Sequence, residues 1–212
     1  MSLMIEDFGG RLASVWSELR PATRGLVERA LQAGNAALPN SSHGNLNTSN
    51  LPYDNRADRE LSRLLAALDE RVIESDLSRQ TDHRNQLRQI ADTCAAVLQE
   101  KTQSAEVFTQ LVRRADSQRD YARVDAIADA LRRFSPTEIC ELARSEDAVV
   151  KALANEALAQ FPTSVLIGLL SDPVDSDIAR EALRRQAMDY GSEEARQIVS
   201  ALDQMNLTQD DL

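Results

Sequence analysis

Hydrophobic residues recur along this chain with the spacing of amphipathic helices. In residues 4–37, apolar positions three and four apart form two stripes, separated at Pro21, where a second helix is expected to begin. The first stripe consists of Ile5, Phe8, Leu12, Val15, Trp16 and Leu19. Because Trp16 lies on this stripe, we expect it in the core or at a helix interface. Residues 4–37 are therefore predicted to form an N-terminal helical hairpin.

Residues 38–55 break the helical pattern. They are rich in Asn, Ser and Pro, and their hydrophobic residues are isolated. A stretch of this length is either a functional loop or a flexible linker, and we favour the linker. Helical spacing returns in residues 56–103, with one polar break at 76–82. We therefore predict a long helical pair over residues 56–103.

From Ser104 onward the chain repeats itself. Three segments have similar sequences, IADAL at 127–131, LANEAL at 153–158 and IAREAL at 178–183. Their final leucines are 25 to 27 residues apart, and a shorter apolar segment precedes each. The sequence SPTE at 135–138 combines a cap residue, a proline and a glutamate in the order that starts helices. A short helix, a turn and a longer helix are predicted three times, followed by a capping helix.

Two of these segments resemble short HEAT-type repeats. They are LARSEDAVVKALANEAL (142–158) and LLSDPVDSDIAREAL (169–183), in which an Asp-Pro-like turn precedes a helix ending in Ala-Leu. The resemblance covers residues 104–190, although its first unit has a polar SQRDYARVD stretch and no proline turn. It implies an all-α fold in which residues 104–205 form a right-handed α-α superhelix of short hairpins, with the capping helix last. Such hairpins stack because one hairpin cannot bury its own apolar face.

Composition agrees with an all-α fold and limits the range of partners. Only 4% of the residues are aromatic. With 7 Gly and 6 Pro, the chain has few residues that break helices, which suits helices joined by short turns. The net charge of −10 works against binding to nucleic acid or to an anionic membrane. No run approaches the roughly 18 apolar residues of a membrane span. We therefore expect a cytoplasmic protein without nucleic-acid or membrane partners.

The sequence contains few residues suited to catalysis. The two histidines, His43 and His83, both lie in polar stretches, which gives a nucleophile no evident base. Cys94 and Cys140 are isolated among apolar or small neighbours, so we predict buried structural thiols rather than a disulfide or a zinc site. Glycine-rich phosphate-binding motifs are missing from the sequence. We therefore predict no catalytic residue, no cofactor and no metal.

The repeat places charged residues at equivalent positions. Counted from the final leucines, one position is acidic in all three segments: Asp129, Glu156 and Glu181. Three residues later stand Arg132, Ala159 and Arg184. Stacked helices would turn these residues into an acidic row beside a broken basic row. One interpretation is a groove that recognises a charged or helical segment of a partner. The other is a solvated face with ion pairs, each worth well under about 1 kcal/mol.

Three functions remain open on the sequence. The leading hypothesis is a non-catalytic scaffold that binds another protein through Asp129, Glu156, Glu181, Arg132 and Arg184. The alternative is an enzyme or enzyme subunit, because HEAT-like folds include DNA-base glycosylases and bilin-attachment lyase subunits. A third hypothesis is a structural, oligomerising protein. In that case residues 38–55 act as a hinge, and the hairpin at 4–37 forms a homodimer.

Overall fold

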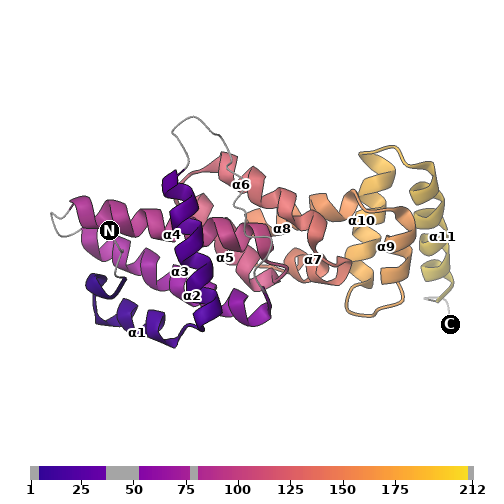
Figure 1. Cartoon of the computed structure of the whole chain (residues 1–212). Helices are drawn as coiled ribbons and strands as arrows, with labels where there is room; N and C mark the ends of the chain where they lie inside the picture. The colour runs from indigo at the N-terminus through magenta and orange to yellow at the C-terminus, as the bar shows by residue number, and fades with distance from the viewer. Residues whose placement is uncertain (1–4, 37–52, 77–80, 210–212) are drawn as a thin grey trace. The chain divides into compact units, whose positions relative to one another are not determined.

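Every regular element in the described part of the chain is a helix. The computed structural model describes residues 5–36, 53–76 and 81–209 (Figure 1). These residues form eleven α-helices and two 3-10 helices, and they contain no strand. The all-α prediction is therefore confirmed for them. Residues 38–52 of the predicted linker, with His43, lie outside the described residues, so the linker and hinge hypotheses stay predictions.

The chain divides into two compact units, residues 1–111 and 112–212. The first unit contains η1 (Ile5–Phe8), α1 (Gly10–Glu18), α2 (Pro21–Ala36), α3 (Asn55–Asp76), α4 (Thr81–Lys101) and most of α5 (Ala105–Ser117). Helices α3 and α4 pack along each other, α1 packs mainly on α3, and α2 packs mainly on α4. The apolar stripes of α1 and α2 therefore complete the core that the α3–α4 pair begins.

The start of the first unit differs from the single helix expected over residues 4–19. Residues 5–8 form a 3-10 helix, and Gly9 separates it from α1 with a φ of 121°, a conformation that favours glycine. The stripe is nevertheless buried as expected, and Trp16 is only 8% exposed. Pro21 begins α2, as predicted. The break at Gly9 therefore changes the path of the chain without exposing its apolar face.

In the second unit, short and longer helices alternate only over residues 136–188. In chain order the helices of this unit are α6 (Tyr121–Ala128), η2 (Asp129–Arg133), α7 (Pro136–Ala143), α8 (Ala148–Ala159), α9 (Thr163–Leu169), α10 (Ser176–Met188) and α11 (Glu193–Gln209). Helix α7 packs on α8 and α9 packs on α10, while α8 also contacts α10 and α11 packs on α10. Sequential packing of this kind makes the unit a helical array.

Local signals explain where these helices begin. Ser135 and Glu138 form the predicted capping box at the start of α7, with Pro136 in its first turn. Asp147 caps α8 by accepting hydrogen bonds from the N–H groups of Val149 and Val150.

The final leucine of each repeat is buried in the core. Leu131, Leu158 and Leu183 are at most 2% exposed. The segment IADAL begins in α6, and its last three residues tighten into the 3-10 helix η2, as helix C-termini often do. The burial of these leucines supports counting positions from them.

Candidate functional site

A groove of about 450 Å³ lies between η2 and α8 in the second unit. Its floor is apolar and includes Leu131, Leu153, Ala157 and Phe161. Its polar lining comes from Asp129, Arg132, Glu156 and Gln160. The volume falls within the range of about 300–1,000 Å³ in which protein ligand sites are found. An apolar floor beside a few polar groups is the usual composition of such sites.

The groove brings together three of the five residues that the sequence analysis singled out. Asp129, Arg132 and Glu156 all line it. Glu181 and Arg184 lie on α10 and do not line it. They approach each other to 4.0 Å, and Arg184 also pairs with Asp203 at 3.2 Å. The five residues therefore divide between two places in the unit.

The charged residues that line the groove differ in how firmly they are held. Asp129 and Arg132 pair along their own helix at 3.4 Å, and their side chains are 71% and 81% exposed. An exposed pair of this kind is worth about 0–1 kcal/mol, so both groups can exchange partners easily. Glu156, in contrast, accepts hydrogen bonds from Tyr190 and Gln160 and pairs with Arg185 at 3.1 Å. The Tyr190 hydroxyl, followed by Gln160 and Arg185, lowers the pKa of Glu156.

The interface between α8 and α10 shows what the groove lacks. There Arg185, two positions after its final leucine, pairs with Glu156 of the neighbouring helix. Gln186, one position later, is buried and donates hydrogen bonds to the carbonyl oxygens of Ala159 at 3.1 Å and Phe161 at 2.6 Å. These contacts fasten α10 to the end of α8.

The same two positions carry different residues just after α8. Gln160 replaces the arginine, and its amide donates to Glu156 of its own helix at 3.1 Å. Phe161 replaces the glutamine and lines the groove. Gln160 carries no charge and Phe161 has no amide, so neither can make the contact that its counterpart in α10 makes with α8. The groove therefore lies beside the two positions at which other residues replace the equivalents of Arg185 and Gln186. The acidic positions alone did not reveal this substitution.

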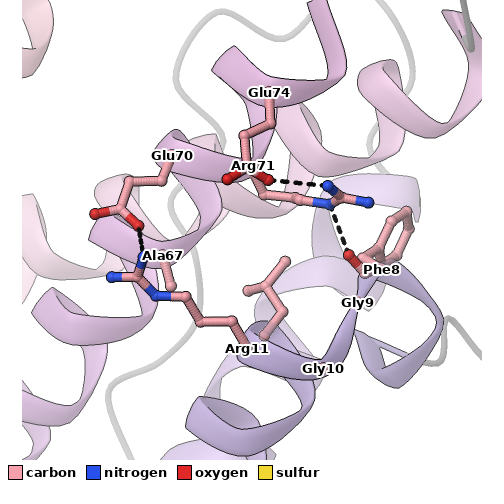
Figure 2. A pocket seen from close by; sticks show the side chains of 9 residues that line it. Phe8, Gly9, Gly10, Arg11, Ala67, Glu70, Arg71 and Glu74 are labelled. Carbon is pink, nitrogen blue, oxygen red and sulfur yellow. Dashed lines mark hydrogen bonds and ion pairs between the residues drawn. The ribbon is translucent and has the colours of Figure 1, made fainter. Parts of the chain in front are cut away.

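A smaller cavity, about 230 Å³, lies in the first unit beside the start of α1 (Figure 2). Its charged lining residues pair with one another. Arg11 contacts Glu70 at 2.6 Å, and Arg71 contacts Glu74 at 2.9 Å. Arg71 also donates from Nε to the carbonyl oxygen of Phe8 at 2.8 Å. Because its volume lies below the range of about 300–1,000 Å³ in which protein ligand sites are found, this cavity is a weaker candidate than the groove.

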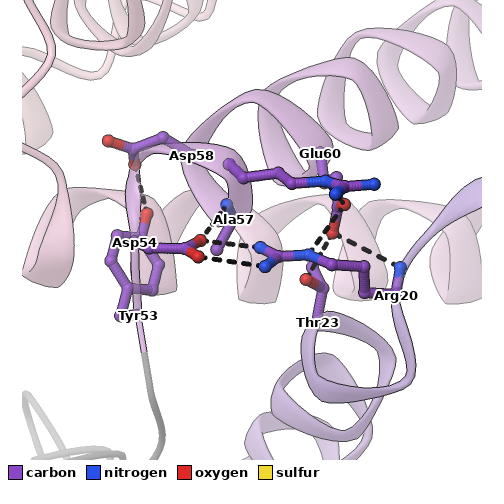
Figure 3. A network of polar contacts seen from close by, with 8 residues as sticks. Arg20, Thr23, Tyr53, Asp54, Ala57, Asp58 and Glu60 are labelled. Atoms are coloured by element: carbon purple, nitrogen blue, oxygen red, sulfur yellow. Dashed lines mark hydrogen bonds and ion pairs between the residues drawn. The ribbon is translucent and has the colours of Figure 1, made fainter.

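A polar network ties the start of α3 to α2 (Figure 3). Arg20 donates two hydrogen bonds to the carboxylate of Asp54, at 2.9 and 2.6 Å, and a third to Glu60 at 3.0 Å. The Thr23 hydroxyl also donates to Glu60. The hydrogen bonds from Arg20 hold the pKa of Asp54 well below its usual range. Asp54 additionally accepts from the N–H of Ala57 at 2.8 Å, which caps α3.

The same network contains a buried carboxylate, Asp58, which is 4% exposed. Burial raises its pKa, although the hydroxyls of Tyr53 and Thr102 both donate to it. Thr102 follows α4, so Asp58 joins the start of α3 to the end of α4. Because one carboxylate oxygen is engaged by each hydroxyl, we assign Asp58 a structural role. Sequence spacing gave no signal for this contact, which spans 44 residues.

The described residues offer little nucleophilic or metal chemistry. His83 is exposed, and its ring packs edge-on against Phe8 with centroids 5.6 Å apart. Cys94 and Cys140 are buried, as predicted, and burial raises the pKa of the Cys140 thiol to about 11, which makes it a poor nucleophile. No group of three or more His, Cys, Asp or Glu side chains in the described ranges is placed to hold a metal ion.

Among the helices that the structure describes, none has both the length and the apolar character needed to cross a membrane. Comparison of the chain with models of protein families, with curated proteins and with solved structures found no match. Function is therefore inferred from the geometry of the groove.

Proposed function

We propose that this protein is a non-catalytic scaffold that binds another protein through the groove between η2 and α8. The observation that carries the proposal is the open, apolar floor beside the solvent-exposed Asp129 and Arg132. Interaction sites combine a pocket for an apolar anchor with polar groups at the margin that set orientation. A groove of about 450 Å³ has room for large side chains of a partner.

The finer architecture is part of the same proposal. We assign residues 104–190 to HEAT-like repeats in a right-handed superhelix, preceded by an N-terminal helical hairpin. The packing supports this assignment, because α7 contacts α9 and α8 contacts α10, so first helices stack on first helices and second on second. Stacked repeats present an extended surface to partners. The proposed location, the cytoplasm, rests on the sequence alone.

Affinity capture from source-organism lysate tests the scaffold function. The intact protein is compared with Ala157→Trp, which fills the groove, and with Ala152→Trp, a control on an exposed position of the same helix. We expect a protein that is captured by the intact chain and by Ala152→Trp but lost with Ala157→Trp. Capture that both variants retain would contradict the groove as the site. Self-association without any captured protein would instead favour the structural, oligomerising hypothesis.

A further inference from the structure

We infer that the partner of this groove is a basic amphipathic helix that places an arginine against Asp129 and an apolar side chain on the floor. This inference rests on the proposed function and names the class of partner. It follows from the contrast between the two interfaces of α8. At one of them the structure contains a helix, α10, whose side chains show which chemistry fits this surface.

Helix α10 supplies two kinds of group to α8. A guanidinium, from Arg185, pairs with the acidic residue Glu156 at 3.1 Å. Ala182, three residues earlier, is buried. Residues three apart lie on the same side of a helix, so the charge and the apolar burial come from one face of α10. A helix that binds next to an acidic position of this array therefore combines an arginine with an apolar residue three or four positions away.

The groove presents the same acidic position without that arginine. Asp129 corresponds to Glu156, and the position that Arg185 holds in α10 is held by the neutral Gln160 just after α8. Asp129 pairs only loosely with Arg132 of its own helix, at 3.4 Å with both side chains largely exposed. A bidentate guanidinium–carboxylate contact is stronger than such a pair, so an arginine from a partner can compete for Asp129.

The floor and the charge of the unit favour the same partner. Leu153 and Phe161 are only partly buried, which leaves apolar surface for an incoming side chain to cover. Residues 112–212 contain 19 acidic and 12 basic residues, a formal charge of −7, which attracts a cationic segment. A helix presents residues three or four apart on one face, so it can reach the carboxylate and the floor together.

Designed peptides test the inference directly. The probe is a capped 16-residue alanine-rich helix with two leucines and two arginines on one face. One comparison peptide has glutamates in place of the arginines, and another has a central proline that prevents the helix. Binding to the full chain is measured by fluorescence anisotropy at low salt. We expect the arginine helix to bind at least about tenfold more tightly than either comparison peptide.

Protein variants place the peptide on the groove. Asp129→Asn is expected to weaken binding of the arginine helix about fivefold to tenfold, because it removes the paired charge. Glu181→Gln removes the equivalent acid on α10, outside the groove, and is expected to leave affinity unchanged within about twofold. Both side chains are about 70% exposed, so unaltered circular dichroism should show that both variants fold.

The outcomes separate this inference from the proposed function. The inference of a basic partner is overturned if the arginine helix does not bind, or if it binds no more tightly than the glutamate helix. It is also overturned if the Asp129→Asn variant binds the arginine helix with unchanged affinity. The inference of a helical partner is overturned if the proline peptide binds as tightly as the arginine helix. In each case the scaffold function stands if Ala157→Trp still abolishes capture of a partner protein. If Ala157→Trp leaves capture intact, the proposed function fails independently of the peptides.

Discussion

Two interfaces of one helix, α8, differ in how they are closed. Toward α10, Arg185 and Gln186 cross to the neighbouring helix and bind its carboxylate and its terminal carbonyl groups. Toward η2, the corresponding residues are Gln160 and Phe161, and a groove of about 450 Å³ remains. The contrast indicates that the second and third residues after the buried leucine determine whether neighbouring second helices pack together or leave a groove between them.

The largest expected effect comes from removing the buried amide that fastens α10. Gln186→Ala leaves the carbonyl groups of Ala159 and Phe161 without this donor, so we expect a loss of about 2–3 kcal/mol in the free energy of unfolding. Gln160→Ala, at an exposed position, is the matched control and should cost less than about 0.5 kcal/mol. Urea unfolding followed by circular dichroism measures both. Equal losses would remove the distinction between the two interfaces.

A second comparison adds volume at equivalent alanines. Ala182 on α10 is 5% exposed, so Ala182→Leu should overpack its surroundings and cost about 1–3 kcal/mol. Ala157 on α8 lines the groove, so Ala157→Leu has space and should change stability by less than about 0.5 kcal/mol. The free energies of unfolding of the two variants measure whether added volume costs stability at Ala182 but not at Ala157. A large loss at Ala157 would mean that the groove is closed in solution.

A smaller effect is expected for the contacts of Glu156. Tyr190→Phe removes the hydroxyl that contributes most to lowering the pKa of Glu156. Because the site is about half exposed and solvent screens the contact, the cost at neutral pH should be small. A lowered pKa in the folded state stabilises it above the ordinary glutamate pKa, and this stabilisation is lost as the pH falls through the folded value. The difference between wild type and variant should therefore vanish on acidification, and a constant difference would contradict this cause.

The smallest effect is expected from supplying the missing cation. Gln160→Arg places an arginine at the position that Arg185 holds in α10, where it can pair with Asp129 across the groove. We expect a stability gain of only a few tenths of a kcal/mol, about 0.2–0.5 kcal/mol, because the pair is exposed. Binding of the arginine helix should fall, since Asp129 is then occupied. Unchanged peptide affinity, measured by anisotropy, would show that Asp129 is not the contact.

Much of the fold could be predicted because its signals are local. Apolar residues three and four apart gave the helices, and Ser135 with Glu138 gave the start of α7. The burial of Leu131, Leu158 and Leu183 follows from the same periodicity. These features depend on residues within one or two turns of each other, which a single sequence records directly.

The site could be predicted only in part. Repeat positions pointed to Asp129 and Glu156 as equivalent acids, and both line the groove. Gln160 and Phe161 also line the groove, and their place in the comparison appears only once the partners of Arg185 are known. The contact between Asp58 and Thr102 was missed for a similar reason, since hydrogen bonds between residues distant in sequence leave no periodic signal.

Cysteine accessibility tests the contrast between the two interfaces most directly. Cys94 and Cys140 are buried, so a single new cysteine reports on its own site. We predict that Ala157→Cys reacts with a bulky maleimide at nearly the rate of the unfolded chain, whereas Ala182→Cys reacts at least about tenfold more slowly. Equal protection of the two cysteines would contradict an open groove between η2 and α8.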